Sequence, residues 1–264
     1  MQSLVYDAIK TEHTKHNKIK DDLVVEAALQ ININKAPYTV VMRTPNDDNA
    51  LIRGLLYAED IYKGKTPLKL ELVETHDNGF SVINATIPKE VLGKGYLNKR
   101  TLLSVSSCGI CGKQKLEDIE LAGETIHSSL KMEMRAIKNM YLEMKASQSL
   151  FRTTGGSHAT AAFDSKQKII SIKEDIGRHN ALDKVVGDLL NSNNLNKAAC
   201  ILVSGRVSYE IVSKAFIAKI PIIVAVSACS SLAVDYAKEF GLCLVGFSRA
   251  DKATIYANPQ YLKL

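Results

Sequence analysis

The sequence lacks a long uninterrupted hydrophobic run. Its longest apolar stretch, residues 220–234, is broken by serines and falls short of the roughly 20 residues that a membrane-spanning helix needs. The N-terminus also lacks an apolar core of signal-peptide length. We therefore expect a soluble, cytoplasmic protein with no membrane contact, in which residues 220–234 form a buried strand that leads into a helix.

The sequence also has no block of lysines and arginines, and aromatic residues make up only 6% of it. Nucleic-acid-binding surfaces usually combine both features, so we expect no nucleic acid partner. The formal net charge of +6 and a pI of about 8.9 are compatible with an anionic ligand or partner. With 264 residues, 46% of them hydrophobic, the chain can bury a core in one large or two small domains.

The sequence has only five cysteines, an odd number that cannot all pair in disulfides within one chain. Without a signal sequence, a chain of this length gives no sign of a disulfide framework. Cys200 and Cys243 lie in apolar, strand-like runs, which predicts buried and inert thiols. Cys108 and Cys111 differ, because serine, glycine and lysine surround them in the segment "SSCGICGK".

This CxxC pair admits three chemistries. Structural zinc would need two more ligands, but no second CxxC is present, the deaminase signature is missing, and His127 and His158 are not spaced like finger ligands. A redox dithiol would favour a helix start after a first strand, whereas about a hundred β-rich residues precede this pair. A nucleophilic thiol on a mobile glycine-rich loop fits better, because Arg100, Lys113 and Lys115 would favour its thiolate.

The pattern of elements predicts an α/β (overall α+β) protein. Residues 23–44 carry two strand-like runs, residues 44–62 a helix that Asp48 or Asn49 would cap, and residues 68–88 a hairpin. The methionine-rich stripe of residues 128–151 has helical spacing and is typical of core or subunit contact. Strands then alternate with helices, so we expect a β-rich domain (1–105), a CxxC loop and linker (106–125) and a layered α/β domain (126–264).

Four further glycine-containing segments stand near strand and helix boundaries: 154–163, 174–184, 204–214 and 246–252. In open α/β sheets, ligands bind at such boundaries, where glycine admits a ligand and helix N–H groups favour anions. Within "EDIGRHNALDK", capping would account for Asn180 and Asp183, but Arg178 and His179 are candidates to face a ligand. Arg206, after Gly205, suits phosphate, and Ser208 would cap the helix that follows. His158 could be a ligand, a base or a turn residue.

Together, the five segments "SSCGICGK", "TGGSHATAAF", "EDIGRHNALDKVVG", "SGRVSYE" and "GFSRADK" resemble the FdhD/NarQ family of accessory sulfurtransferases for formate dehydrogenases, and they occur in the family's order. The resemblance implies a cytidine-deaminase-like fold without structural metal, and a homodimer. It also implies a sulfur carrier that accepts sulfane sulfur from a cysteine desulfurase as a cysteine persulfide. The acceptor would be the molybdenum or tungsten of the bis-molybdopterin guanine dinucleotide cofactor, which formate dehydrogenase then uses.

Carried over to this sequence, the resemblance makes Cys108 the persulfide site and Cys111 its partner. It places the cofactor-binding loop at Phe247, Ser248, Arg249, Ala250, Asp251 and Lys252. The other glycine-containing segments add the candidate contacts Gly155, Gly156, His158, Arg178, His179, Gly205 and Arg206. An alternative is a non-catalytic chaperone that holds a guanine-containing pterin nucleotide, which would leave the CxxC pair without a role. Cys229 stands where family members often have proline, so it is either a third thiol near the site or a packed one.

Overall fold

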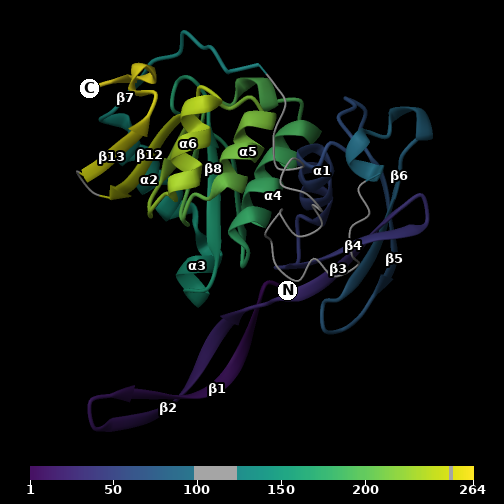
Figure 1. The fold of residues 1–264 in the computed structure, drawn as a ribbon. Coiled ribbons are helices and arrows are strands. Elements are labelled where there is room, and N and C mark those ends of the chain that lie inside the picture. The colour runs from purple at the N-terminus through teal and green to yellow at the C-terminus, as the bar shows by residue number, and fades with distance from the viewer. Residues whose placement is uncertain (98–123, 250–251) are drawn as a thin grey trace.

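The computed structural model describes residues 1–97, 124–249 and 252–264 (Figure 1). Cys108 and Cys111, with their neighbours Arg100, Lys113 and Lys115, lie outside these residues, and so do Ala250 and Asp251. The described residues form a projecting hairpin, a four-stranded sheet and a six-stranded sheet, with helices on the sheet faces. The predicted mixed α/β class is therefore confirmed.

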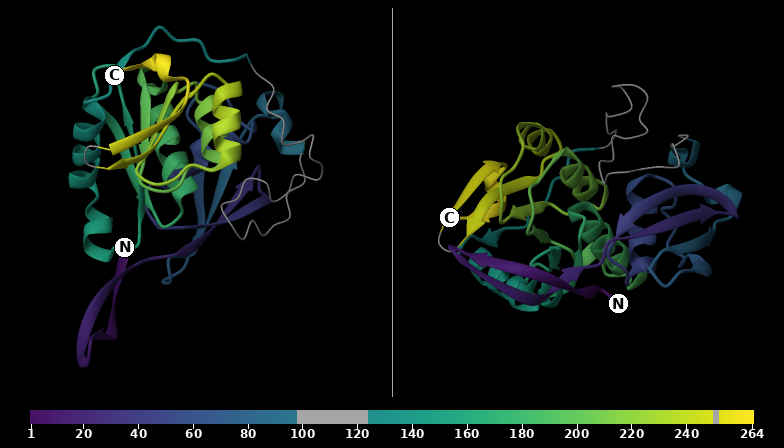
Figure 2. Two further views of the ribbon diagram at one scale, coloured as in Figure 1. Left: turned by 60° about the vertical axis from the view of Figure 1, so that its left-hand side comes forward. Right: turned by 90° about the horizontal axis from the view of Figure 1, so that it is seen from below.

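The hairpin is formed by β1 (Ser3–Glu12) and β2 (Lys15–Val24), which pair in antiparallel register and extend away from the body of the molecule (Figures 1 and 2). The sequence predicted a β-rich region over residues 1–105, but neither of these two strands individually. Both faces of the hairpin are largely exposed, so its strands do not show the apolar alternation that a strand buried on one face produces.

The four-stranded sheet has the order β4-β3-β6-β5. Its strands are β3 (Ala27–Ile33), β4 (Ala36–Arg43), β5 (Lys69–Thr75) and β6 (Ser81–Thr86). The helix α1 (Asp48–Ala58) buries Leu51, Ile52 and Leu56 in the same core as Leu29 and Ile31 of β3. The predicted strands, helix and hairpin are confirmed here. The predicted cap of α1 is wrong, since Asp48 is paired with Arg43 through two hydrogen bonds of 2.9 Å.

The six-stranded sheet has the order β13-β12-β11-β10-β8-β9. Its strands are β8 (His158–Phe163), β9 (Ile169–Asp175), β10 (Cys200–Val203), β11 (Ile222–Ala225), β12 (Cys243–Arg249) and β13 (Lys252–Ala257). The strands β10, β11 and β12 run parallel to one another, and the other three pair antiparallel. The predicted strands are confirmed, and β13 is an addition to them.

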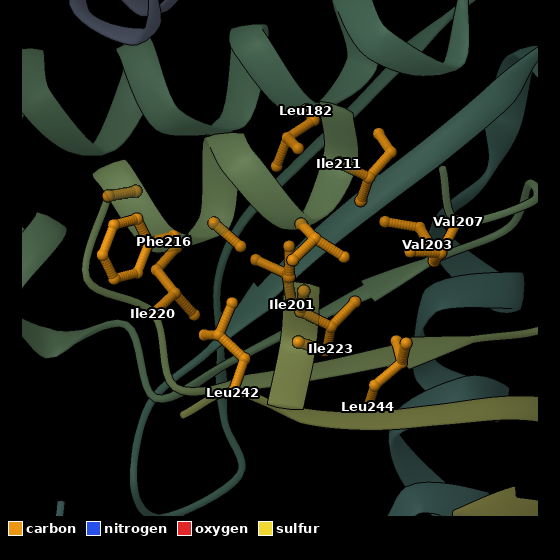
Figure 3. Close-up of a cluster of buried hydrophobic side chains, with 14 of the residues drawn as sticks. Leu182, Ile201, Val203, Val207, Ile211, Phe216, Ile220, Ile223, Leu242 and Leu244 are labelled. Atoms are coloured by element: carbon orange, nitrogen blue, oxygen red, sulfur yellow. The ribbon is translucent and has the colours of Figure 1, made fainter. Parts of the chain in front are cut away.

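Helices cover both faces of this sheet. On one face, α4 (Arg178–Asn191) and α5 (Tyr209–Ile217) pack on Ile201, Ile223 and Leu244 (Figure 3). The helix α6 (Ser231–Glu239) adds Ala233 and Ala237 to the same core. On the other face, α2 (Ala136–Ser147) buries Met140 and Met144 against the sheet, so the methionine stripe is core, as predicted. The short helix α3 (Ser149–Thr154) leads from α2 into β8.

Shorter elements complete the described fold. The strands β7 (Met132–Glu133) and β14 (Leu262–Lys263) pair in parallel. Single 3₁₀ turns are found at η1 (Lys89–Val91), η2 (Lys94–Leu97), η4 (Leu195–Lys197) and η5 (Pro259–Tyr261). Within the described ranges, no helix is long and apolar enough to cross a membrane.

The two main sheets are joined by a close crossing of α1 and α4, at which glycines face backbone. A Cβ atom on Gly187 would lie 1.8 Å from the carbonyl oxygen of Ala50, and one on Gly54 would lie 1.9 Å from that of Asp183. Only glycine allows helices to approach this closely. The boundaries predicted at residues 105 and 125 lie in or beside the undescribed segment, and the three-part division stays a prediction.

Candidate functional site

One edge of the six-stranded sheet gathers the polar, glycine-containing segments. The parallel strands β10, β11 and β12 all end there. Because β8 is antiparallel to β10, its first residue, His158, lies at the same edge and pairs with Asp175, the last residue of β9. We call residues 154–158, 175–179, 204–208, 226–230 and 247–249 the strand-end edge. Open α/β sheets bind ligands at edges of this kind.

Backbone hydrogen bonds make this edge continuous. The N–H of Val207, after β10, donates to the carbonyl oxygen of Ala228, after β11, at 3.0 Å. The N–H of Phe247, near the end of β12, donates to the carbonyl oxygen of Ser227, also at 3.0 Å. The loops that follow the three parallel strands therefore hold one another in place, which gives a ligand a defined surface.

His158, Arg178 and Gly205 come together at this edge. A Cβ atom on Gly205 would lie 3.2 Å from Nδ1 of His158 and 3.4 Å from Cβ and Cδ of Arg178, so glycine permits the approach. Burial lowers the pKa of His158, the charges of Arg178 and Arg206 lower it further, and Asp175 opposes them. At neutral pH the cluster is therefore an uncharged imidazole beside two guanidinium groups, which suits an anionic ligand.

Asp175 has a structural role beneath the cluster. Its Oδ1 accepts hydrogen bonds from the N–H of Gly177 (2.8 Å) and the side-chain amide of Asn180 (2.9 Å). Its Oδ2 lies 2.7 Å from Nζ of Lys184, and neither side chain of this ion pair is exposed. The predicted capping by Asn180 is wrong, because α4 begins one turn earlier than that role requires and, among the described side chains, none caps it.

Thr44 also belongs to this buried network, although the sequence did not indicate it as a site residue. Its N–H donates to Oδ2 of Asp175 at 3.1 Å, its carbonyl oxygen accepts from Lys184 at 2.8 Å, and its hydroxyl accepts from the N–H of Ile176 at 3.1 Å. Thr44 follows β4, so the four-stranded sheet supports the strand-end edge. A threonine after a strand gives no sequence signal for a partner 131 residues away.

Asp183 also differs from its predicted role near the helix start. It lies inside α4, is buried, and forms an ion pair with Lys214 of α5. Burial raises the pKa of its carboxyl group, and Lys214 opposes that shift. The pair connects α4 with α5. The carboxylate of Asp183 is therefore occupied by Lys214 within the protein interior.

His179 is buried, and its Nε2 lies 2.8 Å from Oε2 of Glu210 and 3.2 Å from Oγ of Ser208. Ser208 precedes α5, and its hydroxyl is hydrogen-bonded to His179 instead of a backbone N–H of the helix. The predicted cap by Ser208 is therefore wrong. Burial lowers the pKa of His179, and nearby Lys214 and Arg178 lower it further, whereas Glu210 opposes them. Its ring thus joins the starts of α4 and α5, and its predicted ligand contact stays a prediction.

The two glycines of segment 154–163 have different surroundings. Gly155 ends α3 with a φ of 65°, and a Cβ atom there would meet no neighbour within 4 Å. A Cβ atom on Gly156 would lie 2.8 Å from Cγ1 of Val24, at the base of the hairpin. Gly156 therefore has a packing reason to be glycine, whereas Gly155 faces open space. Ligand contact at either residue stays a prediction.

The end of β12 carries the other predicted contacts. Phe247 has a φ of 52° and is 49% exposed, Ser248 is buried, and Nε of Arg249 donates to the carbonyl oxygen of Val226 at 3.0 Å. Lys252 is exposed at the start of β13. The bond from Arg249 to Val226 attaches this tip to the loop that follows β11, so the tip adjoins the rest of the strand-end edge.

The described cysteines are packed thiols. Cys200 and Cys243 are fully buried, as predicted, and burial raises the pKa of Cys200 and brings that of Cys243 to about 12. Cys229 is partly buried beside Gly246, and burial raises its pKa to about 11. All three are therefore weak nucleophiles at neutral pH. Across the described residues, no group of three or more His, Cys, Asp or Glu side chains could hold a metal ion.

Comparisons with known proteins bear on the whole chain. Proteins named sulfur carrier protein FdhD are similar to it: that of Streptomyces avermitilis is 37% identical over 253 residues, which cover 92% of this chain and 90% of the relative. That of Sulfolobus acidocaldarius is 39% identical over 246 residues, covering 93% and 92%. The crystal structure of a candidate formate dehydrogenase accessory protein from Desulfotalea psychrophila has the same fold, with a TM-score of 0.77, 22% identity and full coverage of both chains.

A family model extends these similarities to most of the sequence. It matches residues 24–263, from the last residue of β2 to β14, and thus includes the strand-end edge and the CxxC segment. By this match and by the identities above, the chain belongs to the FdhD/NarQ family.

Proposed function

We propose that this chain is a sulfur carrier that matures the cofactor of formate dehydrogenase. The observation that carries the proposal is the cluster of His158, Arg178, Gly205 and Arg206, which presents cations at the ligand-binding edge of an open sheet. Its substrate would be the bis-molybdopterin guanine dinucleotide complex of molybdenum or tungsten. The names of the relatives, sulfur carrier protein FdhD, support the same assignment.

In the loading step, the thiolate of Cys108 attacks the outer sulfur of a cysteine persulfide on a cysteine desulfurase. A new S–S bond forms at Cys108, the S–S bond of the donor breaks, and the donor cysteine leaves as a thiolate. No net oxidation occurs. Arg100, Lys113 and Lys115 are close to Cys108 in sequence and would favour its thiolate form.

In the delivery step, we assign Cys111 as the resolving thiol. Its thiolate attacks the inner sulfur of the persulfide, a Cys108–Cys111 disulfide forms, and the outer sulfur leaves as sulfide to the metal of the substrate. The two cysteines supply the two electrons that this sulfur gains. A cellular dithiol then reduces the disulfide and restores the carrier.

The described cations would bind the pyrophosphate groups of the substrate. Guanidinium groups bind phosphate oxygens through two parallel hydrogen bonds, a role open to Arg178 and Arg206. The backbone at Gly205 carries no side chain that would keep a phosphate away. Arg249 and Lys252 would extend the same binding surface along the tip of β12. The carrier would act in the cytoplasm as a homodimer, and size-exclusion chromatography with light scattering tests the dimer.

Restoration of formate dehydrogenase activity in cells that lack their own carrier tests this function. The wild-type protein and Cys229→Ala should restore activity, because Cys229 is a packed thiol of raised pKa. Cys108→Ala should restore none. Under the alternative, a chaperone that only holds a guanine-containing pterin nucleotide, Cys108→Ala would restore activity fully, and the carrier mechanism would be rejected.

A further inference from the structure

The hairpin of β1 and β2 is attached to the body of the molecule at its base. Among the described strands, these two pair only with each other, and they extend away from the two main sheets (Figures 1 and 2). At the base, the N–H of Val25 donates to the carbonyl oxygen of Gln2 at 2.8 Å, and Val24 lies against Gly156. A two-stranded hairpin alone is at best marginally stable in water. The ten-residue strands therefore indicate that a further strand joins this sheet.

The two outer edges of the hairpin differ in their charges. An edge strand presents N–H and C=O groups to which another strand can bind, and lysines along an edge oppose such pairing. The strand β2 carries Lys15, Lys18 and Lys20. The strand β1 carries a single lysine, Lys10, whose Nζ lies 2.8 Å from a carboxylate oxygen of Glu12. The edge of β2 is therefore protected, whereas the edge of β1 is open to another strand.

The side chains of β1 also suit a neighbouring strand. Four large apolar or aromatic side chains of this strand are exposed: Leu4, Val5, Tyr6 and Ile9. β-branched and aromatic side chains stabilise a sheet through contacts with the strand beside them. A second strand of the same sequence would offer matching apolar side chains and no row of lysines. The open edge therefore fits another copy of β1.

We propose that β1 pairs with β1 of a second copy of this chain, antiparallel about a two-fold axis, so that the two hairpins form one four-stranded sheet. A two-fold axis brings the same surface of both copies together, which is the commonest arrangement in oligomers. Full overlap of the two strands would form up to about ten backbone hydrogen bonds, the number found in a typical protein interface. The inference rests on the homodimer of the proposed function and assigns the surface that holds it.

Cysteine cross-linking of the full-length chain tests the pairing. In a Cys108→Ala/Cys111→Ala background, residues 4–10 of β1 are replaced singly by cysteine. The cysteine nearest the two-fold axis faces its own copy with a Cβ–Cβ distance of about 5 Å, so mild oxidation should join the two chains. Lys18→Cys is the control, because Lys18 lies opposite Ile9 on β2. Its two copies would be about 14 Å apart, across three strand spacings, and should stay unlinked.

Added charge on the edge of β1 gives a second, independent test. Val5→Lys/Ile9→Lys should raise the dissociation constant of the dimer at least about tenfold in light scattering over a dilution series, because lysines on an edge oppose pairing. Val73→Lys is the matched control: Val73 lies on the exposed strand β5 and is 58% exposed, against 57% for Val5. It should dissociate as the wild type does.

The possible failures are distinguishable. A wild-type dimer with an unchanged dissociation constant in Val5→Lys/Ile9→Lys and no cross-link at residues 4–10 would reject the pairing but keep the homodimer. Cross-linking of Lys18→Cys in place of residues 4–10 would assign the contact to β2 and also reject it. A wild type that stays monomeric at micromolar concentration would reject both the pairing and the homodimer. Failure of Cys108 to load sulfur would reject the carrier function and leave the pairing intact.

Discussion

Nζ of Lys184 lies 2.7 Å from Oδ2 of Asp175, and neither side chain is exposed to solvent. The pair connects the start of α4 with the end of β9, and through Thr44 it also holds the chain that follows β4. Buried ion pairs are weak evidence for stability, but removal of one partner leaves an uncompensated charge. The support of the strand-end edge therefore depends on keeping both residues.

Asp175→Asn should lower the free energy of unfolding by about 3 kcal/mol, because the charge of Lys184 then lacks its counter-ion. Urea unfolding measures this change. The double variant Asp175→Asn/Lys184→Met should lose less than Asp175→Asn alone. Asp235→Asn, at an exposed position of α6, is the control and should change stability by less than about 0.5 kcal/mol. Equal effects of Asp175→Asn and Asp235→Asn would contradict the role of the pair.

Gly205→Ala tests the cluster at the strand-end edge. The added Cβ atom would lie 3.2 Å from Nδ1 of His158 and 3.4 Å from the side chain of Arg178, so the imidazole must shift by a few tenths of an ångström while Arg178 is left in close contact. We expect pyrophosphate affinity, measured by calorimetry, to fall roughly tenfold, which corresponds to about 1.4 kcal/mol. An unchanged affinity would show that the position of this cluster does not matter for anion binding.

The lowered pKa of buried His179 should make the free energy of unfolding depend on pH. Burial lowers its pKa in the folded state, whereas a histidine in the unfolded chain has a pKa of about 6.5. Between the two values the unfolded chain binds more protons, so stability rises with pH there. The contribution of His179 is therefore present above the unfolded pKa and is lost as pH falls through the folded one.

Urea unfolding from neutral to mildly acidic pH should show this loss in the wild type. His179→Gln, which cannot titrate, should show a smaller loss, and His16→Gln, on the exposed hairpin, should behave as the wild type. The account would be wrong about His179 if the variant kept the full pH dependence.

Thiol labelling separates the CxxC pair from the packed cysteines. Burial raises the pKa of Cys229 to about 11 and that of Cys243 to about 12, so few thiolates exist there at neutral pH. We expect iodoacetamide to modify Cys108 and Cys111 first in the native protein, and all five cysteines only after unfolding. Peptide mass spectrometry reads out the order. Prior modification of Cys229 would point to a third reactive thiol.

The sequence predicted much of the fold because hydrophobic periodicity reports burial. The alternation of β8 to β12 with α4 to α6 and the methionine stripe of α2 were recognised in this way. The hairpin β1–β2 was missed because neither of its faces is buried. Hydrophobic periodicity does not reveal a strand whose two faces are both largely exposed.

For the site, the sequence identified the segments but not the partners of individual side chains. Caps were predicted for Asn180 and Ser208 from neighbouring positions, whereas the structure bonds them to Asp175 and His179. Those contacts depend on how α4, α5 and β9 pack, which local sequence does not contain. The same applies to Thr44, whose partners lie more than a hundred residues further along the chain.

The intact mass of the protein after incubation with a cysteine desulfurase and cysteine tests the central claim most directly. We expect the wild type, Cys111→Ala and Cys229→Ala to gain the mass of about one sulfur atom, which a reducing agent then removes. Cys108→Ala should gain none. Loading of Cys108→Ala to the level of the wild type would contradict the assignment of this chain as a carrier that holds sulfur on Cys108.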